Sequence, residues 1–310
     1  MQNFLITGAG GFVGAHVTRE AAGLAGRLTL ASHRRTPQAP GVDRARIVRA
    51  DLADPDSLRG LCDGADVLVH CASQIGGSAE ANEAVNARGT AALVADAQRA
   101  GVSRIVYLST ASVYGRGIFR RARPEQLPRR PRSPTSRTRA EAEDTVLAAG
   151  GIVVRPYLVY GPGDAWVVPG LRRLLRTLPG TPTGWEARLS VIAVAELAAL
   201  LVAIGLAPRE RLSSSVYHAA YPEPVTACEL LRAVAAGMSL PPARCSVGLA
   251  QARALPTENG AATGAVDMLA TDHWFDSTPL WADLGRAAGS GWEADAARIN
   301  EWYPDLRAAA

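Results

Sequence analysis

Short apolar runs alternate with helix-length segments through the first half of the chain. Strands that are joined by helices run parallel, and a parallel sheet is covered by helices on both faces. The sequence therefore predicts an α/β fold with a doubly wound parallel sheet, and such sheets bind ligands at the carboxyl ends of their strands. The predicted strands are 4–7, 28–32, 47–50, 67–70, 105–109 and 152–155.

A glycine-rich run, TGAGGFVG, follows the first predicted strand and opens a helix. In a dinucleotide-binding turn Gly8 permits the tight turn, Gly11 lets the backbone approach the pyrophosphate, and Gly14 packs the helix on the strand. Amide groups near Phe12 and Val13, at the helix N-terminus, would hold the phosphates. The pattern predicts a Rossmann-type dinucleotide site, with a purely structural glycine turn as the alternative.

The residues after the second and third strands predict which dinucleotide is bound. Residues 32–35 include no acid, whereas a site for NAD usually has a carboxylate there for the ribose 2′-hydroxyl. The serine leaves room for a 2′-phosphate and the arginines can offer it a charged fork, so NADPH/NADP+ is predicted. Alternatively, the two arginines are solvated surface residues, and the aspartate after the third strand is a helix cap that does not contact adenine. The predicted adenosine contacts are Ser32, His33, Arg34, Arg35, Asp51 and Leu52.

Composition excludes several other classes of protein. The chain is 48% hydrophobic and 20% charged, which excludes a largely disordered chain. Its four cysteines are too scattered for a disulfide framework, and its five histidines are isolated, so no metal site is expected. The N-terminus lacks the pattern of a secretion signal, and the apolar stretch 191–207 is broken by Glu196 and too short to span a bilayer. We expect a cytoplasmic protein without a membrane partner.

All 33 basic residues are arginines, against 29 acidic residues. An alanine-rich chain that uses only arginine indicates a GC-rich genome, so arginine is the default surface cation and we expect no nucleic-acid partner. Nine arginines and four prolines fall within residues 116–139. Prolines and repelling cations disfavour a helix, which predicts an irregular excursion there, either a solvated loop or a mobile lid.

Motifs after the later strands resemble those of the extended short-chain dehydrogenase/reductase family. They are HCAS (70–73), NARGT (86–90), STASVYG (109–115), RPYLVYGPGD (155–164), IAVAELA (192–198) and VYH (216–218). The resemblance covers nearly the whole chain. It places Cys71, Ala72 and Ser73 under a nicotinamide cofactor and the backbone near Pro156 and Leu158 at the carboxamide.

The chain's 310 residues can hold one large unit or two coupled lobes. After about residue 165 the pattern changes to shorter helices and strands. We expect a Rossmann domain over residues 1–165, with 187–206 returning to it, and a smaller α/β substrate-binding lobe over 166–310. The resemblance permits a monomer or a homodimer.

The resembling family's catalytic pair is altered in this chain. Members normally carry Tyr-x-x-x-Lys, in which the tyrosine exchanges a proton with the substrate oxygen and the lysine lowers its pKa and holds the nicotinamide ribose. Thr135 stands at the tyrosine position and Arg139 at the lysine position. Arg139 can still donate to ribose hydroxyls, but the hydroxyl of Thr135 is a far weaker acid than a phenol. Thr110 matches the family's carbonyl-polarising hydroxyl, with Ser112 as a weaker candidate, although Thr110 could simply satisfy backbone at a strand end.

The altered pair narrows the possible reactions. Losing a general acid costs roughly 10²- to 10⁴-fold in rate unless something replaces it. Where the ketone already accepts a hydrogen bond from a neighbouring phenol of the same substrate, that phenol can supply the proton in place of the protein. The sequence therefore predicts an NADPH-dependent ketoreductase for an aromatic polyketide ketone in antibiotic biosynthesis. A resemblance to atypical ketoreductases that also depart from the family's pair implies an angucyclinone-like substrate. The alternatives are a non-catalytic NADP(H)-binding sensor or scaffold, and a sugar-nucleotide epimerase or dehydratase with a different base.

Overall fold

A seven-stranded sheet forms the centre of the molecule, and each pair of neighbouring strands runs parallel. The computed structural model describes residues 1–38, 42–238, 245–255, 261–289 and 291–307. The strand order is β12-β7-β5-β4-β1-β2-β3, which confirms the predicted doubly wound fold. The strands are β1 (Phe4–Thr7), β2 (Leu28–Ser32), β3 (Arg46–Arg49), β4 (Val67–His70), β5 (Arg104–Leu108), β7 (Ile152–Pro156) and β12 (Val216–Ala219).

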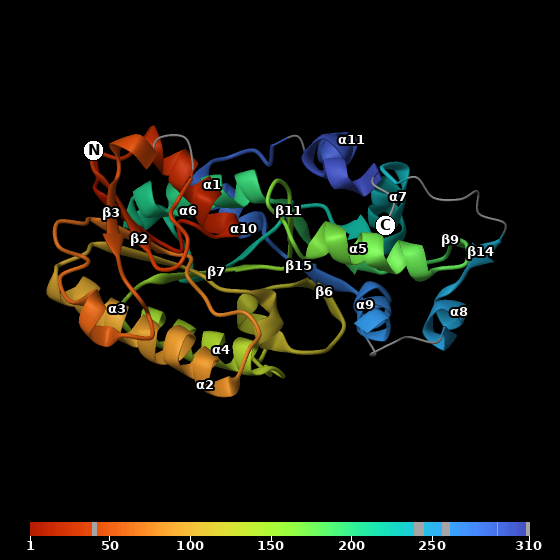
Figure 1. Ribbon diagram of the computed structural model, residues 1–310, viewed down its shortest axis with the longest axis horizontal. Helices are drawn as coiled ribbons and strands as arrows, with labels where there is room; N and C mark the ends of the chain where they lie inside the picture. Colours follow the sequence, from red (N-terminus) through yellow and green to blue (C-terminus); the bar gives the residue numbers. More distant parts are fainter. Residues whose placement is uncertain (39–41, 239–244, 256–260, 290, 308–310) are drawn as a thin grey trace.

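Helices cover both faces of this sheet (Figure 1). Alternate side chains of β1 point to opposite faces, so Phe4 and Ile6 join the core shared with α1 and α6, whereas Leu5 joins the core shared with α3 and α4. The first face carries α1 (Phe12–Ala22), α6 (Val194–Leu206) and α10 (Thr278–Leu284). The second carries α2 (Ala79–Asn82), the π-helical η3 (Glu83–Gly89), α3 (Thr90–Arg99) and α4 (Pro134–Ala148).

Smaller elements extend the molecule beyond the carboxyl ends of the main strands (Figure 1). They include a four-stranded sheet of order β13-β10-β15-β6 and the strand pairs β11–β8 and β14–β9. The strands are β6 (Phe119–Ala122), β8 (Leu158–Tyr160), β9 (Thr181–Pro182), β10 (Arg188–Leu189), β11 (Val191–Ala193), β13 (Val225–Thr226), β14 (Ser246–Val247) and β15 (His273–Phe275). The helices are α5 (Val167–Thr177), α7 (Ala227–Ala236), α8 (Leu249–Ala254), α9 (Ala261–Leu269) and α11 (Gly291–Trp302). The short helical turns are η1 (Val42–Arg44), η2 (Pro55–Leu58), η4 (Ala111–Tyr114), η5 (Pro124–Gln126), η6 (Arg209–Arg211) and η8 (Pro304–Arg307).

The structure corrects the prediction that residues 116–139 form an irregular excursion. Its first part forms β6, which pairs with β15, and its last part forms the first turns of α4. Ser133 caps that helix and Pro134 occupies the first turn, where a missing N–H is not needed. Between them, the guanidinium of Arg129 donates to the carboxylate of Glu143 at 3.2 Å, which ties the segment to α4.

The chain crosses between the predicted lobes more than once. Residues 191–206 form β11 and then α6, and α6 packs on α1 and on the main sheet. The edge strand β12 also comes from beyond residue 166 and pairs with β7. The exact boundary at residue 165 stays a prediction. None of the helices in the described ranges is long and apolar enough to cross a membrane.

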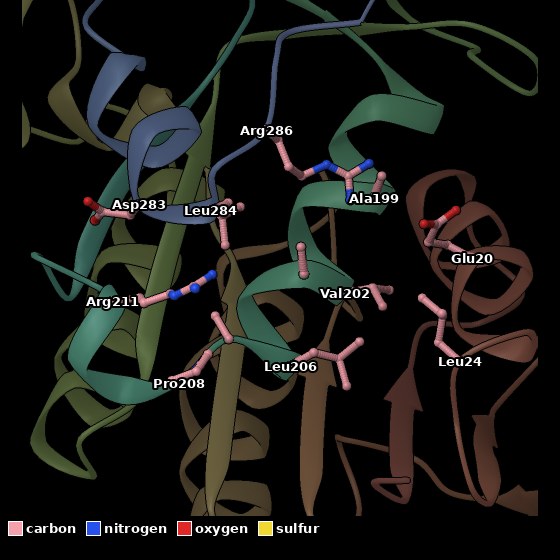
Figure 2. A pocket seen from close by; sticks show the side chains of 12 residues that line it. Glu20, Leu24, Ala199, Val202, Leu206, Pro208, Arg211, Asp283, Leu284 and Arg286 are labelled. Atoms are coloured by element: carbon pink, nitrogen blue, oxygen red, sulfur yellow. The ribbon is translucent and has the colours of Figure 1, made fainter.

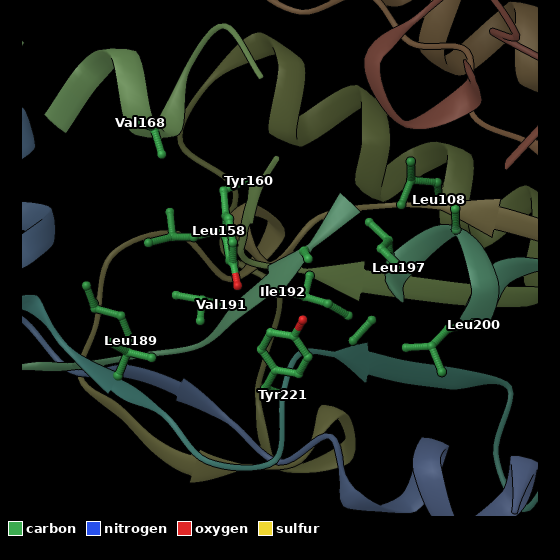
Figure 3. Packing of buried hydrophobic residues seen from close by; sticks show 14 of the residues in the cluster. Leu108, Leu158, Tyr160, Val168, Leu189, Val191, Ile192, Leu197, Leu200 and Tyr221 are labelled. Carbon is green, nitrogen blue, oxygen red and sulfur yellow. The ribbon is translucent and has the colours of Figure 1, made fainter. Parts of the chain in front are cut away.

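A buried cluster surrounds the strand pair β8–β11 (Figure 3) and includes Ile299 of the C-terminal helix α11. Leu158 and Ile192 pack beside the rings of Tyr160 and Tyr221. Both phenol hydroxyls donate to the same carboxylate oxygen of Asp295, each at 2.6 Å. Two donors to one buried acceptor fix α11 against the strands that lead into the site.

Two buried histidines make the fold sensitive to acid. Burial lowers the pKa of His70 to about 3, and burial together with the nearby charge of Arg155 lowers the pKa of His218 to about 3. Both stay neutral in the folded chain at pH values where an unfolded histidine, with a pKa of 6.5, takes up a proton. Their contribution to stability is therefore complete above that value and is lost as the pH falls towards the folded pKa.

We expect the free energy of unfolding to fall by about 1.4 kcal/mol per pH unit for each of these histidines as the pH drops below about 6. Urea unfolding at a series of pH values measures this slope. His70→Gln removes one titrating group, so the variant should show a shallower slope. An unchanged slope in the variant would contradict the assignment of His70.

Candidate functional site

A cavity of about 670 Å³ opens at the carboxyl ends of the main strands. Its lining includes Thr7 from β1, Ser32 from β2, Cys71 after β4, Ser109 after β5 and Pro156 from β7. The strand order reverses between β1 and β4, and the crevice at such a reversal is where doubly wound sheets bind their ligands. The cavity is therefore the candidate site.

The glycine turn forms a cradle that only glycine can build. Gly8 has a φ of +70°, and a Cβ on it would lie 2.7 Å from the amide of Ala72. A Cβ on Gly14 would lie 2.0 Å from the carbonyl oxygen of Gly8. Gly11 precedes α1 without a side-chain cap, so the first amides of that helix are available to an anion. The cradle fits the pyrophosphate of a dinucleotide.

The adenosine end of the cavity has one carboxylate, and that carboxylate is already engaged. Asp51 pairs with the imidazole of His33 at 3.1 Å and accepts from the amide of Ala53 at 2.9 Å. Arg34 and Arg35 are exposed and have no ion-pair partner in the part of the chain that the structure describes. This end therefore presents two exposed arginines, and their contact with a 2′-phosphate stays a prediction.

Most predicted site residues meet in this one cavity. Those that line it are Gly8, Gly11, Phe12, Val13, Gly14, Ser32, His33, Arg34, Arg35, Asp51, Leu52, Cys71, Ala72, Ser73, Thr110, Arg139 and Pro156. Their individual contacts with a cofactor stay predictions.

Three predicted site residues lie outside the lining: Ser112, Thr135 and Leu158. Leu158 is buried in the core, and its amide donates to the carbonyl oxygen of Ser190 at 3.3 Å (Figure 3). The amide of Leu158 is thus used in the connection of β8 to β11, and the predicted contact of the nearby backbone with a carboxamide stays a prediction. Ser112 is the exposed residue of the turn η4, whose other three residues are buried.

Thr110 caps this turn and also lines the cavity. Its hydroxyl oxygen accepts from the amide of Ser112 at 3.2 Å and donates to the hydroxyl of Ser112 at 3.1 Å. The structural alternative for Thr110 is thus realised. A hydroxyl proton rotates freely about its C–O bond, so the same group can also donate to a carbonyl in the cavity.

The altered catalytic pair lies on one face of α4, and the two side chains differ in their surroundings. The hydroxyl of Thr135 accepts from the amide of Gly76 at 3.1 Å and donates to the side-chain oxygen of Asn82 at 2.8 Å. Arg139 is buried, donates to the carbonyl oxygen of Leu108 and lines the cavity. Its Nε is buried without a hydrogen-bond partner, which fits a ribose hydroxyl as acceptor.

One turn further along α4, a buried ion pair fixes the helix to the sheet. Glu143 is fully buried and accepts from Ser109 at 2.5 Å and from two nitrogens of Arg155 at 2.8 and 2.5 Å. Arg155 also donates to the hydroxyl of Tyr114 at 2.7 Å. Glu143 was not among the predicted site residues; its spacing of four residues from Arg139 becomes informative only once α4 is known to be a helix.

The other side of the cavity is apolar and aromatic. Tyr157 lines it and stacks on His273, with ring centroids 5.0 Å apart and an interplanar angle of 11°. Burial raises the pKa of the Tyr157 phenol, whose oxygen has no hydrogen-bond partner. At the rim, Ile75 is 58% exposed and Trp166 is 70% exposed. Exposed large apolar side chains beside a cavity indicate a flat apolar ligand.

A second pocket, of about 270 Å³, lies between α1, α6 and α10 (Figure 2). Apolar side chains such as Val202 and Leu206 line it, and Glu20, Arg211 and Arg286 lie around it (Figure 2). It contains none of the predicted site residues. Within the described ranges, no three His, Cys, Asp or Glu side chains group closely enough to hold a metal ion.

Comparison with known proteins settles the family. Residues 4–219 match the NAD dependent epimerase/dehydratase family. The chain belongs to this family. The 2-alkyl-3-oxoalkanoate reductase of Stenotrophomonas maltophilia (strain K279a) is 29% identical over 314 aligned positions, which cover 91% of this chain and 93% of that protein. Membership confirms the resemblance found in the sequence and, with the cradle, a nicotinamide dinucleotide as cofactor.

Two further similarities are informative. The 4-hydroxy-2-methyl-3-oxo-4-farnesyl-3,4-dihydroquinoline-1-oxide ketoreductase of Stigmatella aurantiaca is 30% identical over 185 residues, covering 56% of this chain and 54% of that protein. The Bordetella bronchiseptica enzyme WbmH, solved in complex with NAD+, is 21% identical with a TM-score of 0.78, covering 98% of this chain and 99% of that chain. At this identity the second similarity shows the shared fold.

Gly14→Ala tests the cradle. The added Cβ would lie against the Gly8 carbonyl, so α1 must shift, and we expect a loss of about 1–3 kcal/mol in stability and at least a tenfold weaker affinity for NADPH. Gly23→Ala is the matched control, because nothing lies within 4 Å of a Cβ there. Thermal unfolding and a fluorescence titration with NADPH measure both effects. Equal behaviour of the two variants would contradict the cradle.

Proposed function

We propose that this protein is an NADPH-dependent ketoreductase that reduces a ketone on an angucyclinone-like aromatic polyketide in antibiotic biosynthesis. The observation that carries the proposal is the engaged hydroxyl of Thr135, which already accepts from Gly76 and donates to Asn82. The position of the family's proton donor is therefore occupied by a group with another task, while the dinucleotide cradle is intact. A substrate that supplies its own proton suits this combination.

Reduction suits the cavity better than proton removal from an unactivated alcohol. Among the acidic side chains of the cavity, Asp51 is engaged with His33 and with its own loop. Asp164 accepts from the amides of residues 166, 167 and 168 and from the hydroxyl of Tyr303. Neither carboxylate is free to act as a base. Two of the relatives described above carry the names of reductases, which supports an enzyme over a non-catalytic binder.

The chemistry needs little from the protein besides positioning. The amides at the start of α1 and Arg139 would hold a bound NADPH, which would supply the hydride. Thr110 would donate to the ketone oxygen and polarise the carbonyl. The substrate's neighbouring phenol would give its proton to that oxygen, and water would then restore the phenol's proton. Ile75 and Trp166 would hold the flat ring system at the rim.

The altered catalytic pair also supports a similarity to one particular ketoreductase. An atypical ketoreductase of simocyclinone biosynthesis acts on an angucyclinone carbonyl and likewise departs from the family's pair. Within the proposal, this chain has the same type of substrate. A small aromatic ketone is then the partner, and a monomer or a homodimer suffices.

An aromatic ketone with an adjacent phenol, compared with its methyl ether, tests the proton source. We expect the phenol to be reduced and the ether to react roughly 10²- to 10⁴-fold more slowly, because the ether has no proton to give. Loss of NADPH absorbance measures both rates. Equal rates would point to a donor in the protein. NADPH binding without oxidation by any phenolic ketone would favour the sensor or scaffold.

The double variant Arg34→Ala, Arg35→Ala tests the coenzyme. We expect roughly a 10- to 100-fold loss of affinity for NADPH and little change for NADH, because hydrogen bonds to a charged group contribute about 1.5–3 kcal/mol. Arg253→Ala is the control, since Arg253 pairs with Asp267 and lies on α8, at the other end of the molecule from β2 (Figure 1). Equal losses for both coenzymes would contradict a 2′-phosphate contact.

A further inference from the structure

Side chains hold the backbone of one short loop at the rim of the cavity. Residues 74–77, here called the rim loop, connect β4 to α2. The side-chain amide of Asn86 accepts from the backbone amide of Gln74 at 2.8 Å and donates to the carbonyl oxygen of Gln74 at 2.9 Å. Asn82 donates to the carbonyl oxygen of Gly76 at 2.7 Å, and Thr135 accepts from the amide of Gly76 at 3.1 Å. Both backbone groups of both residues are thus held from outside the loop.

The two asparagines that hold the rim loop are buried, Thr135 is half-buried, and the three residues are bonded into one network. Asn82 and Asn86 are 0% and 2% exposed. Thr135 donates to Asn82 at 2.8 Å, and Asn86 donates to the hydroxyl of Thr138 at 3.1 Å. Buried polar groups that lose a partner are costly, so this network favours a single arrangement of the loop.

Ile75 lies between the two held residues and lines the cavity. The loop closes tightly after it, because Gly76 and Gly77 have φ values of +68° and +78°. With its neighbours fixed on both sides, Ile75 has little freedom to move along the rim. Trp166 also lines the cavity.

We propose that Thr135 is a positioning residue that fixes the rim loop and thereby sets the place of Ile75 against the substrate's ring system. The substrate part of this inference rests on the proposed function. The phenol oxygen of a tyrosine lies a full ring beyond Cβ, so it cannot make the same two short contacts from this place on α4. Thr135 therefore holds the rim loop and does not act as the proton donor.

Thr135→Val tests the proposal, because valine keeps the shape and loses both hydrogen bonds. We expect the KM for a phenolic ketone to rise roughly tenfold with kcat changed less than about twofold, and Thr135→Ser to restore the KM. Thr145→Val is the matched control: Thr145 is on the same helix, and its hydroxyl bonds only the carbonyl oxygen of Glu141. A fall in kcat with an unchanged KM would overturn the proposal, because it would place Thr135 at the reacting atoms.

Hydrogen exchange of the Gly76 amide gives a readout that does not depend on turnover. We expect exchange in Thr135→Val to be at least tenfold faster than in the unaltered chain and in Thr145→Val. Unchanged exchange would overturn the proposal. If the unaltered chain reduces no ketone, the proposed function fails, and the exchange rate still decides whether Thr135 fixes the loop.

Ile75→Ala keeps the test decisive if Thr135→Val does not fold. We expect Ile75→Ala to raise the KM for the ketone, and Thr135→Ala to add little to that rise in the double variant, because both changes act through one contact. Independent, additive effects of the two changes on the KM would overturn the proposal.

Discussion

The carboxylate of Glu143 is the contact on which the arrangement of the site depends. It is buried between the end of β5, the arginine of β7 and the arginine-rich segment, and it binds a group from each. A buried charge that lost these partners would cost several kcal/mol, so α4 is held in one place. Thr135 and Arg139 precede Glu143 by eight and four residues and share its face of the helix. The ion pair therefore orients the whole altered catalytic pair.

The two halves of the cavity have changed to different extents. The cofactor half keeps the glycine turn and the uncapped helix start that hold a dinucleotide, and the exposed Arg34 and Arg35 line it. In the proton-transfer half, an arginine and a threonine occupy the places of the lysine and the tyrosine. The arginine still faces the cavity, whereas the threonine faces the rim loop. The glycine cradle is thus intact in a chain whose residue at the family's tyrosine position is bonded to the rim loop.

The sequence was most informative where structure depends on neighbouring residues. Each predicted strand of the main sheet lies within one residue of its observed position, because an apolar run specifies a buried parallel strand. The glycine turn was also readable, since its geometry is local. The sequence did not indicate β6 or the contact of Thr135 with Gly76. Each depends on a partner far along the chain, residues 273–275 for β6 and the rim loop for Thr135.

The position of β15 has a consequence for the order in which the protein is completed. This strand lies between β10 and β6, so the small sheet joins residues near 119, 188 and 273. During synthesis, the main sheet can pair all seven of its strands once residue 219 has emerged. His273, on which Tyr157 stacks, is made later. A nascent chain can therefore form its nucleotide cradle before the Tyr157–His273 stack on the other side of the cavity exists.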